Sequence, residues 1–266
     1  MRRAAWTLIA ALAIVVIAAQ WLAPYPYDEM FREEPEAAAS RAHRMGTDSL
    51  GRDRFSRLLK GSQVSLLLAP GAALLSTLLA ALTGGFSAIR GGFLNSLFAV
   101  ISDLFLCLPW MFLLISARAL LPLNSGPEIS VATTYLLLGV LGWAGPARIV
   151  RARLKLLLQR DDRLMVMAAG VSPWRAFRVH LLPNLRPVLA AQFWLTLPVF
   201  ILSEANLSLI GLGVSEPLPS WGNLLRELEN PAAALHSPAI LAPLILLIAV
   251  IGSIQILLSH NSRNSA

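Results

Sequence analysis

Residues 154–187 read LKLLLQRDDRLMVMAAGVSPWRAFRVHLLPNLRP and form the longest polar interruption between two very apolar segments. With the residues that lead into it, this stretch holds nine of the 22 Lys and Arg residues and only two acidic ones. Gly170 ends one helical pattern, and Ser172 with Pro173 opens another, because Ser is a good N-cap and Pro is favoured at the first helical position. Pro183 then ends this second helix. The stretch therefore predicts a basic loop that carries one short helix.

This short helix, residues 172–182, presents large apolar side chains beside basic ones. The apolar side chains follow the i, i+3, i+7 spacing of one helix face, and the basic ones are their neighbours. They are Trp174, Phe177 and Leu181, flanked by Arg175 and Arg178. Exposed aromatic side chains on a basic membrane loop favour docking into a partner protein. The alternative is an ordinary interfacial loop whose aromatic rings lie among lipid headgroups.

The composition is that of a membrane protein. Hydrophobic residues make up 56% of the 266 residues and charged residues only 14%, whereas a soluble domain has about 25% charged residues. The net charge of +7 could indicate nucleic acid binding, but the basic residues follow the sides of the membrane instead. Cys107 is the only cysteine and the four histidines are scattered. The sequence therefore has no disulfide framework, no thiolate metal site and no histidine ligand spacing.

Six apolar segments are long enough to span a bilayer as helices. They are residues 6–23, 64–89, 93–121, 129–150, 188–209 and 239–258. The first segment, with its basic start and the small pair Ala18-Ala19, also resembles a signal peptide, but the apolar run continues past these alanines to spanning length. In the second segment, Gly84-Gly85 would let another helix approach closely. We therefore expect an all-α membrane protein with six transmembrane helices.

The charge distribution predicts the orientation of these spans. The segments placed inside hold 13 basic and 2 acidic residues, and those placed outside hold 9 basic and 11 acidic residues. This asymmetry has the sign that the positive-inside rule requires, with both termini in the cytoplasm. The expected organisation is an N-terminal transmembrane helix, an external loop, a five-helix core that contains the cytoplasmic loop, and a cytoplasmic tail. Their bounds are residues 1–23, 24–63, 64–258 with the loop at 151–187, and 259–266.

The external loop contains the sequence GTDSLGRD, residues 46–53. Its glycines have the spacing of a phosphate-binding P-loop, but Arg52 and Asp53 stand where Lys and Ser or Thr are required, and no hydrophobic strand leads in. The motif is therefore not expected to bind a nucleotide. The following residues 55–68 predict an amphipathic helix that leads into the second span. The motif residues are Gly46, Thr47, Asp48, Gly51, Arg52 and Asp53.

Asp103 and Glu204 are the only acidic residues within the spans. A charge at the bilayer centre costs at least about 2.5 kcal/mol, so both are candidates to line a translocation path, together with Asn206. The alternative is a structural hydrogen bond with Ser102, Ser203 or Asn206, or a contact between subunits. A catalytic carboxylate pair would need both acids at one depth, whereas their positions along their spans differ by roughly 9 Å.

Three stretches resemble one family, the membrane permease subunits of binding-protein-dependent ABC importers, and within it the second permease of the dipeptide, oligopeptide and nickel group. The external motif of that group resembles MGTDSLGRDRFSRLLKGSQVSLLL (45–68). Its segment after the fifth helix resembles LSLIGLGVSEPLPSWGNLL (207–225). Its cytoplasmic loop, with a spaced Gly and Leu-Pro, resembles AAGVSPWRAFRVHLLPNLRPVL (168–189). Order and spacing agree from about residue 24 to residue 258.

The resemblance implies the type I ABC importer permease fold and a mechanism. The short cytoplasmic helix acts as a coupling helix in a groove of an ATPase subunit, and closure of the ATPase dimer on ATP switches a permease pair between inward-facing and outward-facing states. The implied partners are a homologous permease subunit, two ATPase subunits and an external substrate-binding protein, in a bacterial inner membrane. ATP and Mg²⁺ belong to the ATPase subunits, and this chain is expected to bind no cofactor and to be no enzyme. The implied ATPase-coupling residues are Gly170, Val171, Ser172, Trp174, Arg175, Phe177, Arg178, Leu181, Leu182 and Pro183.

The sequence departs from the family pattern at two places. Leu164-Met165-Val166 occupy the positions of the usual Glu-Ala-Ala triplet, and SHNSRNSA replaces the usual charged tail. A divergent member with an adapted partner is favoured over one with impaired coupling, since the external motifs would be expected to decay too if function were lost. Peptides are the expected cargo, and nickel or a nickel chelate is the alternative. Two rival classes are an intramembrane hydrolase that uses Asp103 and Glu204, and a membrane scaffold that does not transport.

Overall fold

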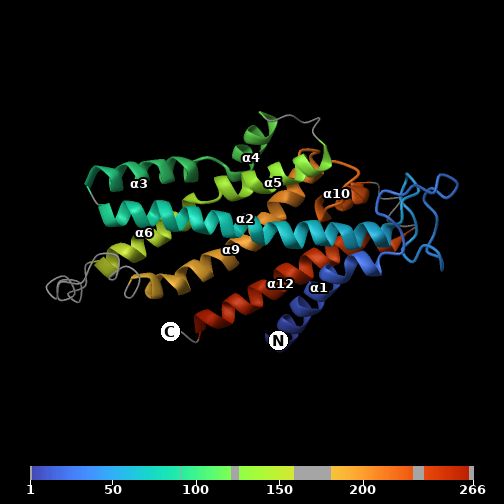
Figure 1. Ribbon diagram of the computed structural model, residues 1–266, viewed down its shortest axis with the longest axis horizontal. Helices are drawn as coiled ribbons and strands as arrows, with labels where there is room; N and C mark the ends of the chain where they lie inside the picture. The colour runs from blue at the N-terminus through green and yellow to red at the C-terminus, as the bar shows by residue number, and fades with distance from the viewer. Residues whose placement is uncertain (1, 91, 121–125, 159–180, 230–236, 264–266) are drawn as a thin grey trace. The chain divides into compact units, whose positions relative to one another are not determined.

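The computed structural model describes residues 2–90, 92–120, 126–158, 181–229 and 237–263. Over these ranges the regular secondary structure is helical, and β-structure is limited to one isolated bridge between Thr47 and Asp53. Figure 1 shows the arrangement of the elements. The helices are α1 (Arg2–Leu22), α2 (Arg54–Arg90), α3 (Gly92–Cys107), α4 (Trp110–Ala119), α5 (Pro127–Leu141), α6 (Ala144–Leu158), α9 (Leu182–Leu209), α10 (Trp221–Leu225) and α12 (Ala242–Arg263), with short 3-10 helices η2 (Arg226–Glu229) and η3 (Pro238–Leu241).

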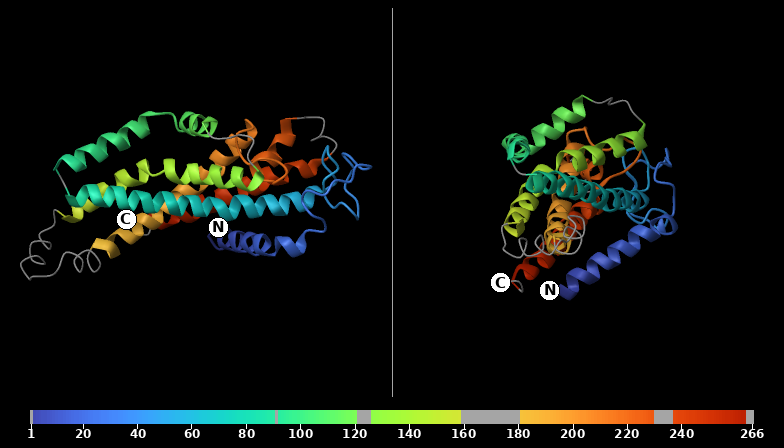
Figure 2. Two further views of the ribbon diagram at one scale, coloured as in Figure 1. Left: turned by 45° about the horizontal axis from the view of Figure 1, so that its top comes forward. Right: turned by 60° about the vertical axis from the view of Figure 1, so that its left-hand side comes forward.

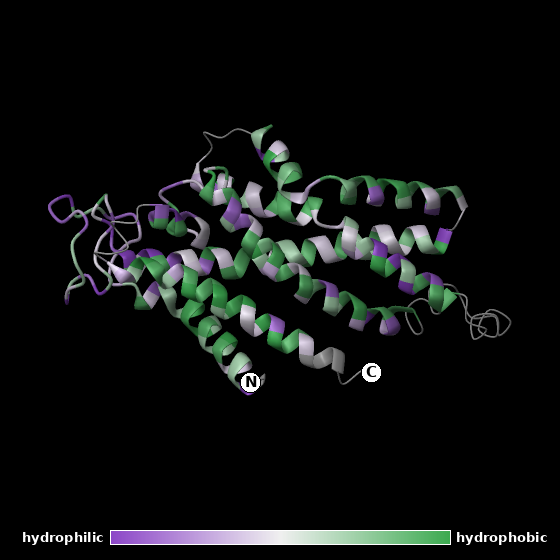
Figure 3. Cartoon of the chain, turned by 180° about the vertical axis from the view of Figure 1, so that it is seen from behind, coloured by the Kyte–Doolittle hydropathy of each residue, from purple (hydrophilic) through white to green (hydrophobic). Residues whose placement is uncertain are grey.

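The long helices are apolar over most of their surface (Figure 3). α1, α2, α9 and the C-terminal segment Pro238–Ser259 are each long and apolar enough to cross a membrane. So is Pro127–Leu158, which joins α5 and α6 and extends beyond the expected residues 129–150 at both ends. Large apolar side chains on these helices are exposed; Ile17 and Trp21 of α1 are 66% and 79% exposed. Such side chains suit lipid, in which a helix satisfies its own backbone hydrogen bonds. The expectation of an all-α membrane protein is confirmed.

The predicted third span, residues 93–121, is not one straight helix. α3 ends at Cys107, α4 begins at Trp110, and the two helices meet at 90°. Pro109 between them has no N–H to donate, and its ring hinders the preceding residue from continuing a helix. Its carbonyl instead accepts from the N–H of Leu113 in the first turn of α4. The described ranges therefore contain five candidate spans, or six if this bent pair is one broken span.

Several helices extend further than hydropathy predicts. α2 is continuous from the motif loop to Arg90 with Pro70 inside it, so the expected amphipathic helix and the second span are one element. α9 begins at Leu182 instead of near residue 188, and α12 continues to Arg263, inside the expected tail. The reason is that a polar helix end keeps its backbone bonds within the helix, although its composition no longer marks it as membrane-spanning.

Contacts divide the chain into two compact units: Met1–Pro70, Ile115–Leu136 and Pro198–Ala266 form the first, and Gly71–Leu114 and Leu137–Leu197 form the second. In the first unit α1 packs against α12, and the first turn of α1 and the last turn of α12 lie away from the loop that precedes α2 (Figures 1 and 2). The short helix α10 packs against α12 and η3. We call the two extramembrane segments of this unit, residues 23–53 and 211–229, the cap.

The second unit depends on a close approach between α2 and α6. A cluster of buried apolar side chains from α2, α6 and α9 lies within it. Its members are Ala88, Val150, Leu154 and Leu185. One turn before this cluster, a Cβ at Gly84 would collide with the carbonyl oxygen of Ala147 on α6. This contact confirms for Gly84, but not for Gly85, the prediction that the glycine pair lets another helix approach closely, as small residues do in membrane bundles.

Candidate functional site

The carboxylate of Asp48 organises the GTDSLGRD loop. Its Oδ1 accepts hydrogen bonds from the backbone N–H groups of Leu50 and Arg52 at 2.9 and 2.8 Å, and its Oδ2 accepts from Arg52 Nε at 2.7 Å. Asp is favoured in turns because its short side chain can bond the backbone two residues further on. Both Asp48 and Arg52 are buried. The loop therefore has a charge-assisted contact at its centre, a kind stronger than a neutral hydrogen bond.

Gly46 and Gly51 set the path of this loop. Their φ angles are 71° and 77°, a region in which an L side chain is strained. A Cβ at either position would also overlap a backbone carbonyl, that of Ala37 or that of Phe31. The N–H of Phe31 in turn donates to the carbonyl of Gly51 at 2.9 Å. The loop is thus closed against the preceding segment of the cap.

Asp53 fixes the start of α2. Its Oδ2 accepts from the N–H of Ser56 at 2.8 Å, so Asp53 is the N-cap of the helix. Its Oδ1 lies 3.0 Å from His43 Nδ1. The ring of His43 packs against Tyr25 and Phe31, with centroids 5.1 and 4.8 Å away. Hydrogen bonds and aromatic packing therefore hold the same helix end.

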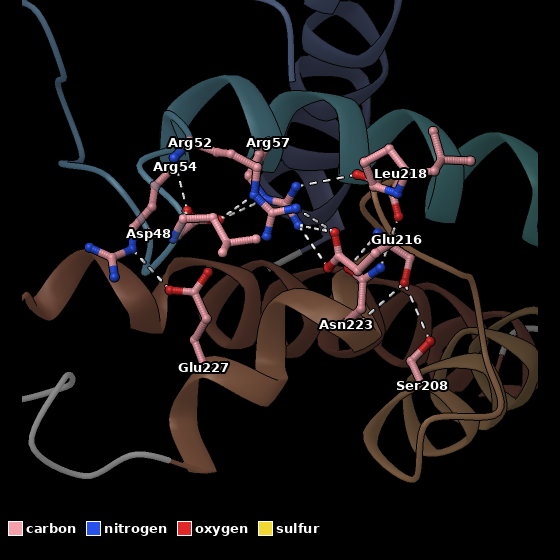
Figure 4. Close-up of polar contacts among 12 residues, drawn as sticks. Asp48, Arg52, Arg54, Arg57, Ser208, Glu216, Leu218, Asn223 and Glu227 are labelled. Atoms are coloured by element: carbon pink, nitrogen blue, oxygen red, sulfur yellow. Dashed lines mark hydrogen bonds and ion pairs between the residues drawn. The ribbon is translucent and has the colours of Figure 1, made fainter. Parts of the chain in front are cut away.

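Glu216, in the second cap segment, joins that segment to the motif (Figure 4). Arg52 Nη1 donates to Glu216 Oε2 at 2.6 Å, and Arg57 Nη2 donates to both carboxylate oxygens at 3.0 and 3.1 Å. A separate ion pair, from Arg54 Nε to Glu227 Oε2 at 2.9 Å, ties the start of α2 to η2. Arg52 and Glu216 are 164 residues apart in the chain. The two cap segments are therefore one structure, although the sequence separates them widely.

The charges in this network balance. Two guanidinium groups, of Arg52 and Arg57, face two carboxylates, of Asp48 and Glu216; Arg57 Nε lies 3.6 Å from Asp48 Oδ2. Burial lowers the pKa of Arg52, but the charges of Asp48 and Glu216 and the hydrogen bonds to them outweigh this effect and hold the pKa above its ordinary value. The side chain of Glu216 is 48% exposed, whereas that of Asp48 is 3% exposed. Solvent therefore screens the Glu216 end of the network far more than the Asp48 end.

The second cap segment ends in the one-turn helix α10, which is capped at its start. Ser220 Oγ accepts from the N–H of Asn223, and the Asn223 side chain accepts from the N–H of Ser220 at 2.8 Å, which is a capping box. Trp221 is fully buried. Its Nε1 donates to Ser62 Oγ at 2.9 Å and its backbone N–H donates to Ser65 Oγ at 3.1 Å. These bonds fix α10 to α2.

Glu204 links α9 to α10 and is fully buried. Its Oε1 accepts from Ser208 Oγ and from Ser220 Oγ, each at 2.7 Å, whereas Oε2 has no hydrogen-bond partner of normal geometry within the described ranges. Packing here is tight, since a Cβ at Gly222 would lie 2.6 Å from the Cα of Ala205. In this structure Glu204 therefore holds the two helices together, and a role in a translocation path stays a prediction.

The hydrogen-bond partners of Glu204 in the structure differ from those predicted from the sequence. The candidates predicted from the sequence are Ser102, Ser203 and Asn206. Glu204 instead bonds Ser208, one turn further along its own helix, and Ser220 in the cap. The hydroxyls of the two predicted serines donate to carbonyls four positions earlier, and the predicted asparagine is exposed. Residues four apart on a helix are neighbours, so the i, i+4 serine has the shortest reach.

Asp103 lies on α3 in the second unit, in a different environment. Its Oδ1 is 3.4 Å from Arg148 Nη1 on α6, and the two side chains are 54% and 61% exposed. In a membrane span, a pairing of this kind reduces the cost of placing either charge in the apolar layer. Asp103 therefore has a cationic partner of its own, and its place in a path also stays a prediction.

Most of the expected ATPase-coupling residues lie outside the described ranges. They are Gly170, Val171, Ser172, Trp174, Arg175, Phe177 and Arg178. Of the remaining three, Leu181 packs partly buried against the apolar cluster of the second unit, and Leu182 opens α9. Pro183 is the second residue of α9, where its missing N–H costs no helical bond. The coupling role of this set stays a prediction.

Sequence reasoning missed Arg57, Glu216 and Arg118 as residues of this region. The buried Arg118 of α4 donates from Nε to the carbonyl of Leu212 and from Nη2 to Ser130 Oγ, each at 3.1 Å. It thus anchors the second cap segment to α4 and α5. For Arg57 and Glu216 a signal is present, because both lie inside stretches that resemble the permease family. For Arg118 the sequence carries no comparable signal.

Taken together, a rigid ion-paired cap joins the ends of several apolar helices. Over the described ranges, no group of three or more His, Cys, Asp or Glu side chains is arranged to hold a metal ion. The fold and the cap define the class: a membrane protein with several spanning helices and an ordered extramembrane cap built from two distant segments.

Within this class, residues 76–264 match the family described as the binding-protein-dependent transport system inner membrane component. The chain belongs to this family. It is accordingly a membrane permease component of an ABC-type transport system.

Individual relatives agree with this membership. The chain is 32% identical over 216 residues to the dipeptide transport system permease protein DppC of Bacillus subtilis (strain 168). The aligned residues are 81% of this chain and 66% of the relative. The chain is 30% identical over 220 residues to the oligopeptide transport system permease protein OppC of the same organism, covering 83% and 70%. The di/tripeptide transport system permease protein DppC of Pseudomonas aeruginosa (strain UCBPP-PA14) is 32% identical over 218 residues, covering 80% and 70%. The matched part thus spans about two-thirds of the length of each relative.

Proposed function

We propose that the chain is the transmembrane permease subunit of an ATP-driven importer and that it translocates peptides delivered by an external binding protein. The family description supports the dependence on a binding protein. The relatives are permeases of dipeptide, oligopeptide and di/tripeptide transport systems, which favours peptides over nickel or a nickel chelate as the cargo. One structural observation carries the proposal. Arg52 and Arg57 bond Glu216 and so join the two external stretches that resemble peptide permeases.

In this proposal the chain itself does not hydrolyse ATP. Two partner ATPase subunits bind ATP and Mg²⁺, and the coupling helix of this chain, residues 172–182, docks into one of them. A homologous second permease completes the membrane part, and the pair alternates between inward-facing and outward-facing states. The membrane is a bacterial inner membrane with both termini in the cytoplasm. The first turn of α1 and the last turn of α12 lie on the side of the first unit away from the cap, which supports this orientation.

The first test is affinity purification of the tagged full-length chain from native membranes in a mild detergent, followed by mass spectrometry. We expect a second permease and two ATPase subunits to co-purify, because the family works as part of a multi-subunit transport system. Recovery of the chain alone from repeated, stable preparations would contradict the proposal. It would favour a non-transporting scaffold, or a hydrolase whose activity needs no ATP and is abolished by Asp103→Asn.

The cargo is tested separately. The binding protein encoded with the co-purified subunits is titrated with peptides of two to five residues and with nickel, and uptake of the tighter ligand into proteoliposomes of the assembled complex is then measured with and without ATP. We expect ATP-dependent uptake of a peptide. Uptake of nickel alone would overturn the peptide assignment and leave the importer assignment standing.

A further inference from the structure

A groove of about 340 Å³ lies within the first unit, where the end of α1 meets the start of α2. One wall consists of the last turn of α1 and the segment that follows it, residues 19–27, and the other wall consists of Ser56, Lys60 and Gln63 of α2. The groove is separate from the ion-pair network at Glu216, and nothing in the proposed transport mechanism uses it. Its walls combine an apolar helix face, two tyrosine rings and one cation.

The cation, Lys60, has no anionic partner within the described ranges. Its Nζ lies 3.5 Å from Gln63 Oε1 and 5.7 Å from the centroid of the Tyr27 ring. The first contact is at the outer limit of a hydrogen bond, and an ammonium has three donors to satisfy. None of the ion pairs within the described ranges includes Lys60. An unpaired ammonium that faces a groove is suited to an anion.

The walls are held in place before any ligand arrives. Gln63 Nε2 donates to the carbonyl of Val16 at 2.9 Å and so joins α2 to α1 beside the groove. The N–H of Tyr25 donates to Ser56 Oγ at 3.3 Å. The Tyr25 ring also packs edge-on against Phe31, with centroids 4.9 Å apart. A ligand would therefore lose little free energy in ordering the site.

The residues around the groove are of the kinds found where a membrane changes from acyl chains to headgroups. α1 ends at Leu22, just after Trp21, which is 79% exposed, and the first cap segment begins at the next residue. On α2, Leu67 lies two turns beyond Lys60 on the same face and is 56% exposed. Tyr and Trp rings are typical of this interface, and a Lys there extends its ammonium toward the headgroups.

We infer that this groove binds the phosphate of a membrane phospholipid, with the Lys60 ammonium as its anchor. A lipid fits better than free phosphate because the two helices that line the groove also expose apolar side chains, Trp21 on α1 and Leu67 on α2, along which acyl chains can lie. Burial, and next the charge of Asp28 and that of Glu128, raise the pKa of Tyr27, so its hydroxyl stays protonated and able to donate. The recognised group is the phosphodiester, so phosphatidylglycerol and phosphatidylethanolamine both bind.

The test uses the full-length chain, with any subunits that co-purify, after delipidation in detergent. Native mass spectrometry measures the occupancy of palmitoyl-oleoyl phosphatidylglycerol, palmitoyl-oleoyl phosphatidylethanolamine and the matching diacylglycerol, which lacks phosphate. We expect one saturable phospholipid and no saturable diacylglycerol. Lys60→Gln should weaken phospholipid binding about tenfold or more, as expected for loss of a charged hydrogen-bond donor, and Lys60→Arg should restore most of it.

The matched control is Arg226→Gln, which removes an exposed cation of the cap outside the groove and should leave lipid binding unchanged. The restoring variant Lys60→Arg shows that the fold survives a change at this position. Equal binding of diacylglycerol, or unchanged phospholipid binding in Lys60→Gln, would overturn the inference. Competition by millimolar inorganic phosphate would show a free-anion site, and a cross-link from position 60 to a co-purified protein would show a protein contact; each result would also refute the lipid assignment.

Discussion

At the scale of single residues, Asp48 and Glu216 neutralise the same two arginines but differ in exposure, 3% against 48% for their side chains. Asp48→Asn leaves two buried guanidinium groups with one carboxylate and should lower the free energy of unfolding by about 3 kcal/mol. Glu216→Gln should lower it by about 1 kcal/mol, because water screens that end. Thermal unfolding in detergent, followed by size-exclusion chromatography, measures both changes.

The control for this pair is Glu33→Gln, which removes an exposed acid of the same cap and should leave the melting temperature unchanged. Equal melting temperatures for Asp48→Asn and Glu216→Gln would show that burial does not decide the strength of this network.

Glu204 offers a second residue-scale prediction. Glu204→Gln keeps an acceptor oxygen for the two serine hydroxyls and should retain near-native stability, because the carboxylate has no cationic partner within the described ranges. Glu204→Leu leaves both hydroxyls without this acceptor and should cost about 2 kcal/mol. The same unfolding assay separates them. A glutamine variant as unstable as the leucine variant would mean that the negative charge itself is needed.

The site was only partly predictable at this scale. The motif residues 46–53 and the acid Glu204 stand out in the sequence because of residue type and position. Their partners do not, since Glu216 is 164 residues from Arg52, and no local pattern states which arginine faces which acid. Helix geometry alone would have proposed Ser208 for Glu204, at i+4, but Ser220 comes from another element.

At the scale of elements, alanine substitutions at the two neighbouring glycines of α2 are expected to have opposite effects on stability. A Cβ at Gly84 would collide with the carbonyl of Ala147, whereas a Cβ at Gly85 would meet only Leu154 Cδ1 at 3.7 Å, an ordinary contact. Gly84→Ala should therefore push α6 away from α2 and cost about 2 kcal/mol. Gly85→Ala should be neutral or stabilising by about 0.5 kcal/mol, because Ala favours helix. The two variants control one another in a single melting experiment, and an equal loss in both would contradict the close approach.

Helix existence was more predictable than helix shape. Each apolar segment that hydropathy marks contains helix in the structure, because backbone groups in lipid must bond within their own segment. Hydropathy could not place the 90° break at Pro109, since proline in a membrane span is compatible with a mild kink as well as a full break. Hydropathy also placed the start of α9 too late, near residue 188 instead of Leu182, because Asn184 and Arg186 interrupt the apolar run.

At the scale of the whole molecule, the proposed coupling of the cytoplasmic loop to an ATPase can be tested by its effect on uptake. Gly170→Asp should abolish ATP-dependent uptake and leave the chain in the membrane, because a bulky charge would then stand beside the proposed coupling helix, residues 172–182. Uptake into proteoliposomes and the amount of chain in the membrane fraction measure the two effects separately. The control is Arg226→Gln, far along the chain in the cap. Normal uptake by the Gly170→Asp transporter would refute the coupling assignment and favour the scaffold class.

The joining of the two cap segments at Glu216 also limits how this chain can be recombined with its relatives. A chimaera that takes residues 45–60 from another permease replaces Asp48, Arg52 and Arg57, but keeps Glu216, the acid that both arginines face, on the resident segment 207–225. The two stretches therefore need to be exchanged together, although they are far apart in the sequence. Loop grafting should therefore succeed when both stretches are moved together and fail when either is moved alone.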